Sequence, residues 1–264
     1  MKKLSEQMIE ALKKGYEANS LEGINKSTLR ALFGHRYIDQ SGKLSRNAIN
    51  YVISELTIEK QCHEINIDFD IIDLNYNSNP EKNLLKYFND KGYFGCHYEG
   101  ISIFTILKAL MLNELSRHNY FGSRDDACSR YLEAQLVILK DKSTEIIQSI
   151  SKTDKQTFLN NFAEIINNKF ISIEYPDLSV SFADALFDAI DSSIFINLAN
   201  KINEDPYRFR TGWPDLTIVK NEDVQFIEVK TTDKLHLSQL DTIPIMRDIL
   251  PFKFRVIKLR KSKI

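Results

Sequence analysis

Residues 212–219 read GWPDLTIV, and residues 225–230 read QFIEVK. Each run is short and apolar with acidic residues near its edge, and the polar residues 221–223 between them suit a hairpin. Side chains alternate along a strand, so Glu228 and Lys230 should project from the same face. The hairpin would bring Asp215 alongside them from the neighbouring strand. Two carboxylates and an ammonium group would then share a small volume.

This crowding of like charges has a chemical meaning. Carboxylates that lie so close repel each other unless a hard divalent cation lies between them. Asp215 and Glu228 therefore predict a Mg²⁺ site. Lys230 would lie beside the water that the cation activates.

Length, charge and cysteine content narrow the possible classes of protein. The chain of 264 residues is enough for one large domain or for one domain with an appended module. A formal net charge of -1 gives no global attraction to nucleic acid, although a nuclease can keep its positive charge local. Cys62, Cys96 and Cys128 form no CxxC spacing, so neither a zinc site nor a disulfide framework is supported.

The sequence shows no targeting or membrane signal. The N-terminus becomes charged again at Glu6 without an apolar signal-peptide core. No apolar run approaches the roughly 18 residues that a bilayer span requires. We therefore expect a soluble, cytoplasmic protein that does not contact a membrane.

Residues 1–75 predict a small helical module. Helical periodicity runs up to Gly15, a second helix should end at Gly34, and a third should begin after Ser45. This order favours a helix-turn-helix or winged-helix-like interpretation, in which Arg46 would face DNA phosphates. A helical cap with solvated lysines and arginines is the alternative.

The sequence between the module and the motif is mostly helical. Residues 65–71 alternate apolar and acidic side chains and predict an edge strand or a connector. A helix should begin at Pro80, a turn should cover residues 92–95, and a largely buried helix should follow from residue 101. Later elements are expected at 124–140, 142–150, 154–168 and 179–201 as helices, at 237–250 as a helix kinked by Pro244, and at 252–257 as a last strand.

The approach to the motif interleaves arginines with aromatic residues. Arg208 and Arg210 are well placed to hold a phosphodiester near the predicted metal. Ion pairs with nearby acidic residues are the alternative. Lys234, in the polar turn that follows Lys230, is a further predicted DNA contact.

These motifs together resemble a known group of enzymes. GxPD at residues 212–215, FxEVK at 226–230 and LxxxQ at 235–239 resemble the PD-(D/E)xK nuclease superfamily, and more narrowly its virus-type replication-repair nuclease branch, the VRR-NUC domain. Residues 98–100, YEG, precede an apolar helix and are similar to the start of the nuclease domain in the Fanconi-associated nuclease. The resemblance covers about residues 92–259.

The resemblance implies a fold of the α/β class, mixed α+β. Its restriction-endonuclease-like core would be a small central mixed sheet flanked by helices. The nuclease domain would span residues 76–264 and contain a large helical insertion at about 118–205. The helical module of residues 1–75 would precede it.

The resemblance also implies roles for individual residues. Lys230 would orient or deprotonate the attacking water, and Gln239 would position the site or the scissile phosphate. Two features differ from the family pattern, because residues 231–232 are two threonines where a Gly-Pro-rich turn is usual, and the interval to Gln239 is about one residue shorter. The implied ligands of Mg²⁺ or Mn²⁺ are Glu99, Asp215, Glu228 and the backbone carbonyl of Val229.

The implied activity is that of a metal-dependent deoxyribonuclease. It would hydrolyse phosphodiester bonds in flap or branched DNA during DNA repair, as a monomer or a homodimer. One alternative is a restriction-type or Holliday-junction-resolving endonuclease, which would normally need a dimer. Another is a DNA-binding protein with an inactive nuclease fold. The intact set of Asp215, Glu228 and Lys230 argues against the last, because a dead site has no physical reason to retain clustered like charges.

Overall fold

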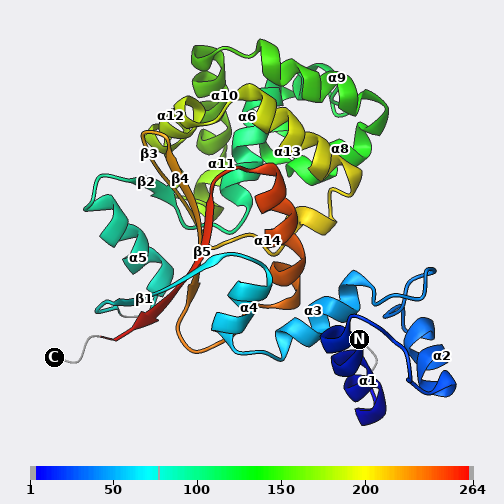
Figure 1. The fold of residues 1–264 in the computed structure, drawn as a ribbon. Helices are drawn as coiled ribbons and strands as arrows, with labels where there is room; N and C mark the ends of the chain where they lie inside the picture. Colours follow the sequence, from blue (N-terminus) through cyan, green and yellow to red (C-terminus); the bar gives the residue numbers. More distant parts are fainter. Residues whose placement is uncertain (1–3, 77, 262–264) are drawn as a thin grey trace.

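A mixed five-stranded sheet organises the fold (Figure 1). The computed structural model describes residues 4–76 and 78–261. The strand order is β1-β5-β4-β3-β2, in which β3 is antiparallel to β2 and β4, whereas β5 is parallel to β4 and β1. The strands are β1 (Asp68–Asp73), β2 (Phe94–Cys96), β3 (Leu216–Lys220), β4 (Asp223–Lys230) and β5 (Lys253–Arg260).

Helices cover both faces of the sheet. One face packs on α5 (Pro80–Asn89), whose Leu84 and Phe88 share a small core with Ile227 and Val229. The other face packs on α14 (Leu237–Ile249) and α6 (Ile101–Arg117) within the main core, which contains Phe226. Because side chains alternate along β4, Glu228 and Lys230 lie on the Phe226 side, facing α14.

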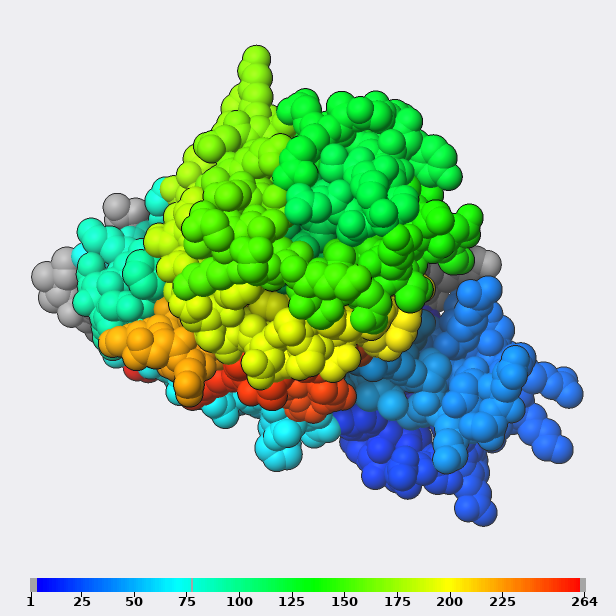
Figure 2. Space-filling view, turned by 90° about the horizontal axis from the view of Figure 1, so that it is seen from above, coloured from blue at the N-terminus to red at the C-terminus, as the bar shows by residue number. Residues whose placement is uncertain are grey.

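The helical insertion follows α6 and returns to the sheet before β3. In Figure 2 its green and yellow residues form a thick block over one side of the molecule. Asn161, on α10, ties the block to α6, because its side-chain amide donates to the Ala109 carbonyl oxygen at 2.9 Å. Its helices are α7 (Arg124–Ser129), α8 (Leu132–Ile138), α9 (Ser143–Gln148), α10 (Lys155–Asn167), α11 (Lys169–Glu174), α12 (Val180–Ala189) and α13 (Ser192–Glu204), with short 3-10 turns η1 (Lys140–Lys142), η2 (Ser149–Lys152) and η3 (Arg208–Arg210).

The N-terminal helices form a lobe beside α14, seen in blue in Figure 2. They have a small core of their own, which includes Leu12, Leu32 and Ala48, and α3 packs against α14. The fourth helix and β1 belong instead to the main body, since Cys62 lies in the main core and β1 pairs with β5. The helices are α1 (Glu6–Ala18), α2 (Lys26–Gly34), α3 (Arg46–Ser54) and α4 (Ile58–Glu64). The domain boundary at residue 75 stays a prediction.

The fold class predicted from the sequence is confirmed, with local corrections. Residues 94–96 form the edge strand β2 instead of part of a turn, and the expected helices at 124–140 and 179–201 are each broken in two. The first helix continues past Gly15 to Ala18, and Pro244 lies inside α14 without ending it. Residues 68–73 form the expected edge strand. Of the helices within the described ranges, none is both long and apolar enough to cross a membrane.

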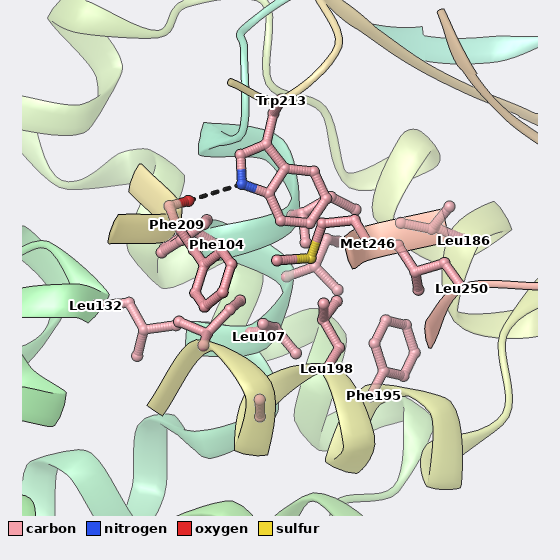
Figure 3. Packing of buried hydrophobic residues seen from close by; sticks show 14 of the residues in the cluster. Phe104, Leu107, Leu132, Leu186, Phe195, Leu198, Phe209, Trp213, Met246 and Leu250 are labelled. Carbon is pink, nitrogen blue, oxygen red and sulfur yellow. Dashed lines mark hydrogen bonds between the residues drawn. The ribbon is translucent and has the colours of Figure 1, made fainter. Parts of the chain in front are cut away.

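The loop before β3 is fixed by Trp213, which is almost completely buried (Figure 3). Its indole Nε1 donates to the Phe209 carbonyl oxygen at 2.8 Å, and its ring lies 6.2 Å from that of Phe104 on α6. Gly212 enters this loop with φ +86°, and a Cβ there would lie 2.2 Å from the carbonyl oxygen of Ser238 on α14. The loop that carries Asp215 is therefore pressed directly against α14.

We expect Gly212→Ala to lower the free energy of unfolding by at least about 2 kcal/mol, because the left-handed backbone alone costs an L-residue roughly 1–2 kcal/mol and the new methyl group collides with Ser238. Urea denaturation measures this. Gly34→Ala is the control, because open space surrounds that helical glycine. Equal stability of the two variants would contradict the close approach of the loop to α14.

Candidate active site

A polar cavity of about 270 Å³ lies where β4 ends. It is walled by the N-terminus of α5, the loops before α6 and β3, and the start of α14. All five side chains predicted to be catalytic line it, together with Val229. Its charged lining is Glu81, Glu99, Asp215, Glu228, Asp233 and Lys230.

Glu228 and Lys230 form a buried ion pair. Their side chains are 1% and 4% exposed, and Lys230 Nζ lies 2.9 Å from Glu228 Oε1. Gln239 donates its Nε2 hydrogen to the same oxygen at 2.6 Å, while its own Oε1 accepts from the His236 backbone N–H at 2.9 Å. The capping geometry of α14 therefore fixes Gln239, and Gln239 orients Glu228. Asp233 completes the surroundings of Lys230 at 3.1 Å.

Asp215 joins the pair from the neighbouring strand, as the hairpin predicts. Residues 221–222 form the turn, and Leu216 pairs with Ile227 across β3 and β4. Asp215 Oδ2 accepts the Val229 backbone N–H at 2.8 Å. The side chain of Asp215 is thereby held at the end of β4, next to Glu228.

Glu99 lies at the rim of the cavity. It precedes α6, whose N-cap is Gly100. Glycine suits this position, because its φ is +60° and a Cβ there would lie 2.8 Å from the Trp213 ring. Glu99 Oε1 accepts the Gly212 backbone N–H at 2.7 Å. This carboxylate therefore ties the start of α6 to the loop that carries Asp215.

Glu81 is a cavity residue that the motif analysis missed. It lies in the first turn of α5, after the N-cap Asn79 and Pro80, and its charge contributes to the raised pKa of Asp215. An acidic residue in a first helical turn is common for electrostatic reasons alone. The topology could have identified it, because the fold brings the N-terminus of α5 to the end of the sheet at which β4 ends.

Burial and mutual repulsion dominate the electrostatics. Burial raises the pKa of Asp215 to about 6 against the hydrogen bond from Val229, and Glu81 adds to this effect. Burial and the charge of Asp215 raise the pKa of Glu228 well above its usual value. Burial alone would lower the pKa of Lys230, but Glu228 and Asp233 outweigh it and raise that pKa. Lys230 is thus held as an ammonium group.

The donor set fits a hard divalent cation. Glu228 Oε2 is buried and, within the described residues, has no hydrogen-bond partner, whereas Oε1 already accepts from Lys230 and Gln239. An unsatisfied buried carboxylate oxygen is costly unless something outside the protein satisfies it. Mg²⁺ and Mn²⁺ prefer such oxygen ligands.

The predicted DNA contacts are engaged within the protein. Arg208 and Arg46 both pair with Asp241 on α14, at 3.0 Å and 2.8 Å. Arg210 lies 3.5 Å from a carboxylate oxygen of Glu133 and over the Tyr131 ring. Arg208 and Arg210 thus pair with acids, which is the alternative weighed from sequence, and Arg46 is paired where a solvated arginine was the alternative. The contacts of these residues with DNA stay a prediction. The ammonium group of Lys234 donates to the Glu55 carbonyl oxygen at 2.9 Å.

A second group of potential metal ligands lies where the end of α6 meets the insertion. Glu114, His118 and Glu145 offer ligand atoms within 4.8 Å of one another. Arg117 pairs with both glutamates, so a protein cation already balances their charge. We assign this group no function.

We expect Asp215→Asn to be more stable than the wild type above pH 6 in the presence of EDTA. The native state holds a proton on Asp215 between pH 3.8 and about 6 that the unfolded chain has lost, so wild-type stability falls as pH rises through this window. Asparagine keeps an oxygen acceptor for Val229 without the charge. The gain should reach about 3 kcal/mol at most and vanish below pH 3.8.

Urea denaturation of both proteins at pH values from 3.5 to about 8 measures this difference. Glu222→Gln, in the exposed hairpin turn, is the control and should leave the pH dependence unchanged. If the free energies of unfolding of wild type and Asp215→Asn change in parallel with pH, the pKa of Asp215 is not raised in the folded protein.

Comparisons with known proteins support the fold. No protein-family model and no curated protein matches the chain. Among solved structures, paFAN1 bound to gapped DNA with a 2-nucleotide 5′ flap is similar at a TM-score of 0.57 and 14% identity, with 97% of this chain and 52% of that chain covered. paFAN1 bound to gapped DNA with a 1-nucleotide 5′ flap gives 0.55 and 13%, with 98% and 53% covered. The chain therefore has a FAN1-like nuclease fold and spans about half the length of those chains.

Proposed function

We propose that this protein is a metal-dependent DNA nuclease that cleaves flap or branched DNA, with a role in DNA repair. The observation that carries the proposal is the buried, unsatisfied Oε2 of Glu228 beside Asp215 and the ammonium group of Lys230. Buried like charges of this kind lower stability unless a bound cation balances them. A phosphodiesterase uses them to bind a cation.

Mg²⁺ or Mn²⁺ would be held by Asp215, Glu228, Glu99 and the Val229 carbonyl. To this predicted set we add Glu81, because it lines the same cavity. When bound, the ion supplies Lewis-acid activation of water and of the phosphoryl oxygen. The protein supplies the rigid frame, since a backbone N–H holds Asp215 and Gln239 holds Glu228.

Lys230 would act as a fixed positive charge. Its raised pKa keeps it protonated at neutral pH, which favours orienting the attacking water over removing a proton from it. An ammonium group in this place also stabilises the negative charge that develops at phosphorus. Asp233 and Glu228 fix its position from two sides.

DNA with a flap is the substrate that we favour. The fold is similar to that of paFAN1 bound to 5′ flap DNA, although at 14% identity and over half of that chain. The predicted phosphate contacts Arg208, Arg210, Arg46 and Lys234 would have to leave their partners within the protein to reach DNA. We propose that Arg208 and Arg46 exchange Asp241 for phosphate oxygens.

We expect Lys230→Ala and Asp215→Asn each to reduce flap cleavage by roughly 10²–10³-fold or more, because each removes charge stabilisation used in the transition state. Both variants should remain folded, which circular dichroism checks, and should keep an affinity for flap DNA near that of the wild type. Lys253→Ala and Glu222→Gln remove the same charges at exposed positions outside the cavity, and should cleave normally.

Cleavage assays with end-labelled DNAs measure activity and substrate choice together. The substrates are flap, four-way-junction and linear duplex DNAs, each with Mg²⁺, Mn²⁺ or EDTA. Cleavage should require a cation and should be fastest on the flap. Preferred cutting of the junction by a dimer would favour the resolving-endonuclease alternative. Wild-type cleavage by purified Lys230→Ala or Asp215→Asn would sink the assignment.

A further inference from the structure

A second and larger cavity, of about 750 Å³, lies along α5. Its walls are α5, the segment of β2 and the start of α12. Figure 1 shows α5 beside β2, which is an edge strand of the sheet. This volume is within the range of about 300–1,000 Å³ that is usual for small-ligand sites. It is large enough for one nucleotide.

The two cavities are neighbours. Glu81 lines the catalytic cavity and Lys82, the next residue, lines the larger one. On the opposite wall, His97 lines the larger cavity two residues before Glu99, which lines the catalytic one. Consecutive Cα atoms lie about 3.8 Å apart, so the two cavities adjoin at the start of α5 and a strand that leaves the catalytic cavity past α5 would enter the second cavity.

The charge of the second cavity is opposite to that of the catalytic cavity. Lys82 and Lys86 lie one helical turn apart on α5, and Asp177 is the acid that lines the cavity with them. Asp177 pairs with Lys82 at 3.1 Å, whereas Lys86 forms no ion pair within residues 4–76 and 78–261. The pair of lysines thus leaves a net positive charge, which suits a phosphate group.

The other wall offers a stacking surface and a polar group. Phe94, on the edge strand β2, lines the cavity and is 48% exposed, so its ring is accessible to a ligand there. His97 Nδ1 is buried and has no hydrogen-bond partner among the described residues. Aromatic rings beside lysines are the elements with which proteins bind single-stranded nucleic acids, because every base has a π-face.

We propose that this cavity binds an unpaired nucleotide next to the scissile phosphate, with the base stacked on Phe94 and the phosphate held by Lys86 and Lys82. The inference rests on the proposed nuclease function and specifies the part of the substrate that the chain recognises. It explains how an acidic catalytic cavity accepts a polyanion, since the adjoining lysines attract the strand. It also supplies a reason for selecting DNA with unpaired nucleotides.

The test is equilibrium binding in EDTA, by fluorescence anisotropy, of flap DNA and of the matched duplex without unpaired nucleotides. We expect Phe94→Ala to weaken flap binding roughly tenfold, in line with the loss of one stacked base, and to leave duplex binding unchanged. Phe94→Tyr, which keeps an aromatic ring, should retain the wild-type affinity. Lys86→Ala should make the slope of log affinity for flap DNA against log salt concentration shallower, by the amount that corresponds to about one phosphate contact.

Matched controls are Phe33→Ala and Lys140→Ala, which alter an exposed aromatic and an exposed lysine away from both cavities. In cleavage assays, Phe94→Ala should raise KM for the flap and leave kcat nearly unchanged. Unchanged flap affinity in folded Phe94→Ala and Lys86→Ala, or an equal loss on flap and duplex, would overturn the proposal.

The two proposals fail separately. Flap cleavage by the wild type with no effect of Phe94→Ala or Lys86→Ala would overturn the nucleotide site and leave the nuclease function standing. Flap binding that depends on Phe94 and Lys86, in a wild-type protein that cleaves no DNA, would uphold the nucleotide site and overturn the nuclease function.

Discussion

The buried ion pair between Glu228 and Lys230 is the interaction on which the rest of the site depends. Removing such charges from water costs several kcal/mol per ion, so each needs compensation from its surroundings. Gln239 and Asp233 supply part of that compensation. Gln239 is in place only because α14 begins at His236, and α14 is held by the sheet on one side and by α3 on the other. The pair therefore couples the last strand of the hairpin to α14 and, through it, to the N-terminal lobe.

A second constraint comes from the loop before β3. Trp213 is anchored in the main core among residues of α6 and α13 (Figure 3). Gly212 lies against α14. Glu99, from the start of α6, holds the same loop through the Gly212 backbone. The whole helical insertion lies between Glu99 and Asp215 in sequence, and the antiparallel pairing of β2 with β3 brings the segments that carry these two residues together. This pairing is a long-range contact, which explains why a sequence motif alone cannot define the site.

The sequence predicts best what local periodicity controls. Alternation along residues 225–230 places Glu228 and Lys230 on one face, and a polar turn places Asp215 beside them, as the structure has it. Glu81 could not be found in this way, because its approach depends on how α5 packs across the sheet. Strand β2 was hidden because Gly92, just before it, and Gly95, within it, resemble a turn, although a Cβ at Gly95 would lie 2.6 Å from Leu85 and 2.8 Å from Ile218. The partners of Arg46 and Arg208 could not be predicted either, because their pairing with Asp241 depends on tertiary contacts.

Direct measurement of cation binding in the absence of DNA tests the central claim, which is that Asp215 and Glu228 form a metal site. Titration calorimetry with Mn²⁺ on the wild type and on Glu228→Gln separates binding from catalysis. We expect a saturable site in the wild type and a loss of affinity in Glu228→Gln greater than the roughly 10–100-fold that removal of an outer-shell partner causes. Equal Mn²⁺ affinity in the two folded proteins would contradict a metal site at Glu228.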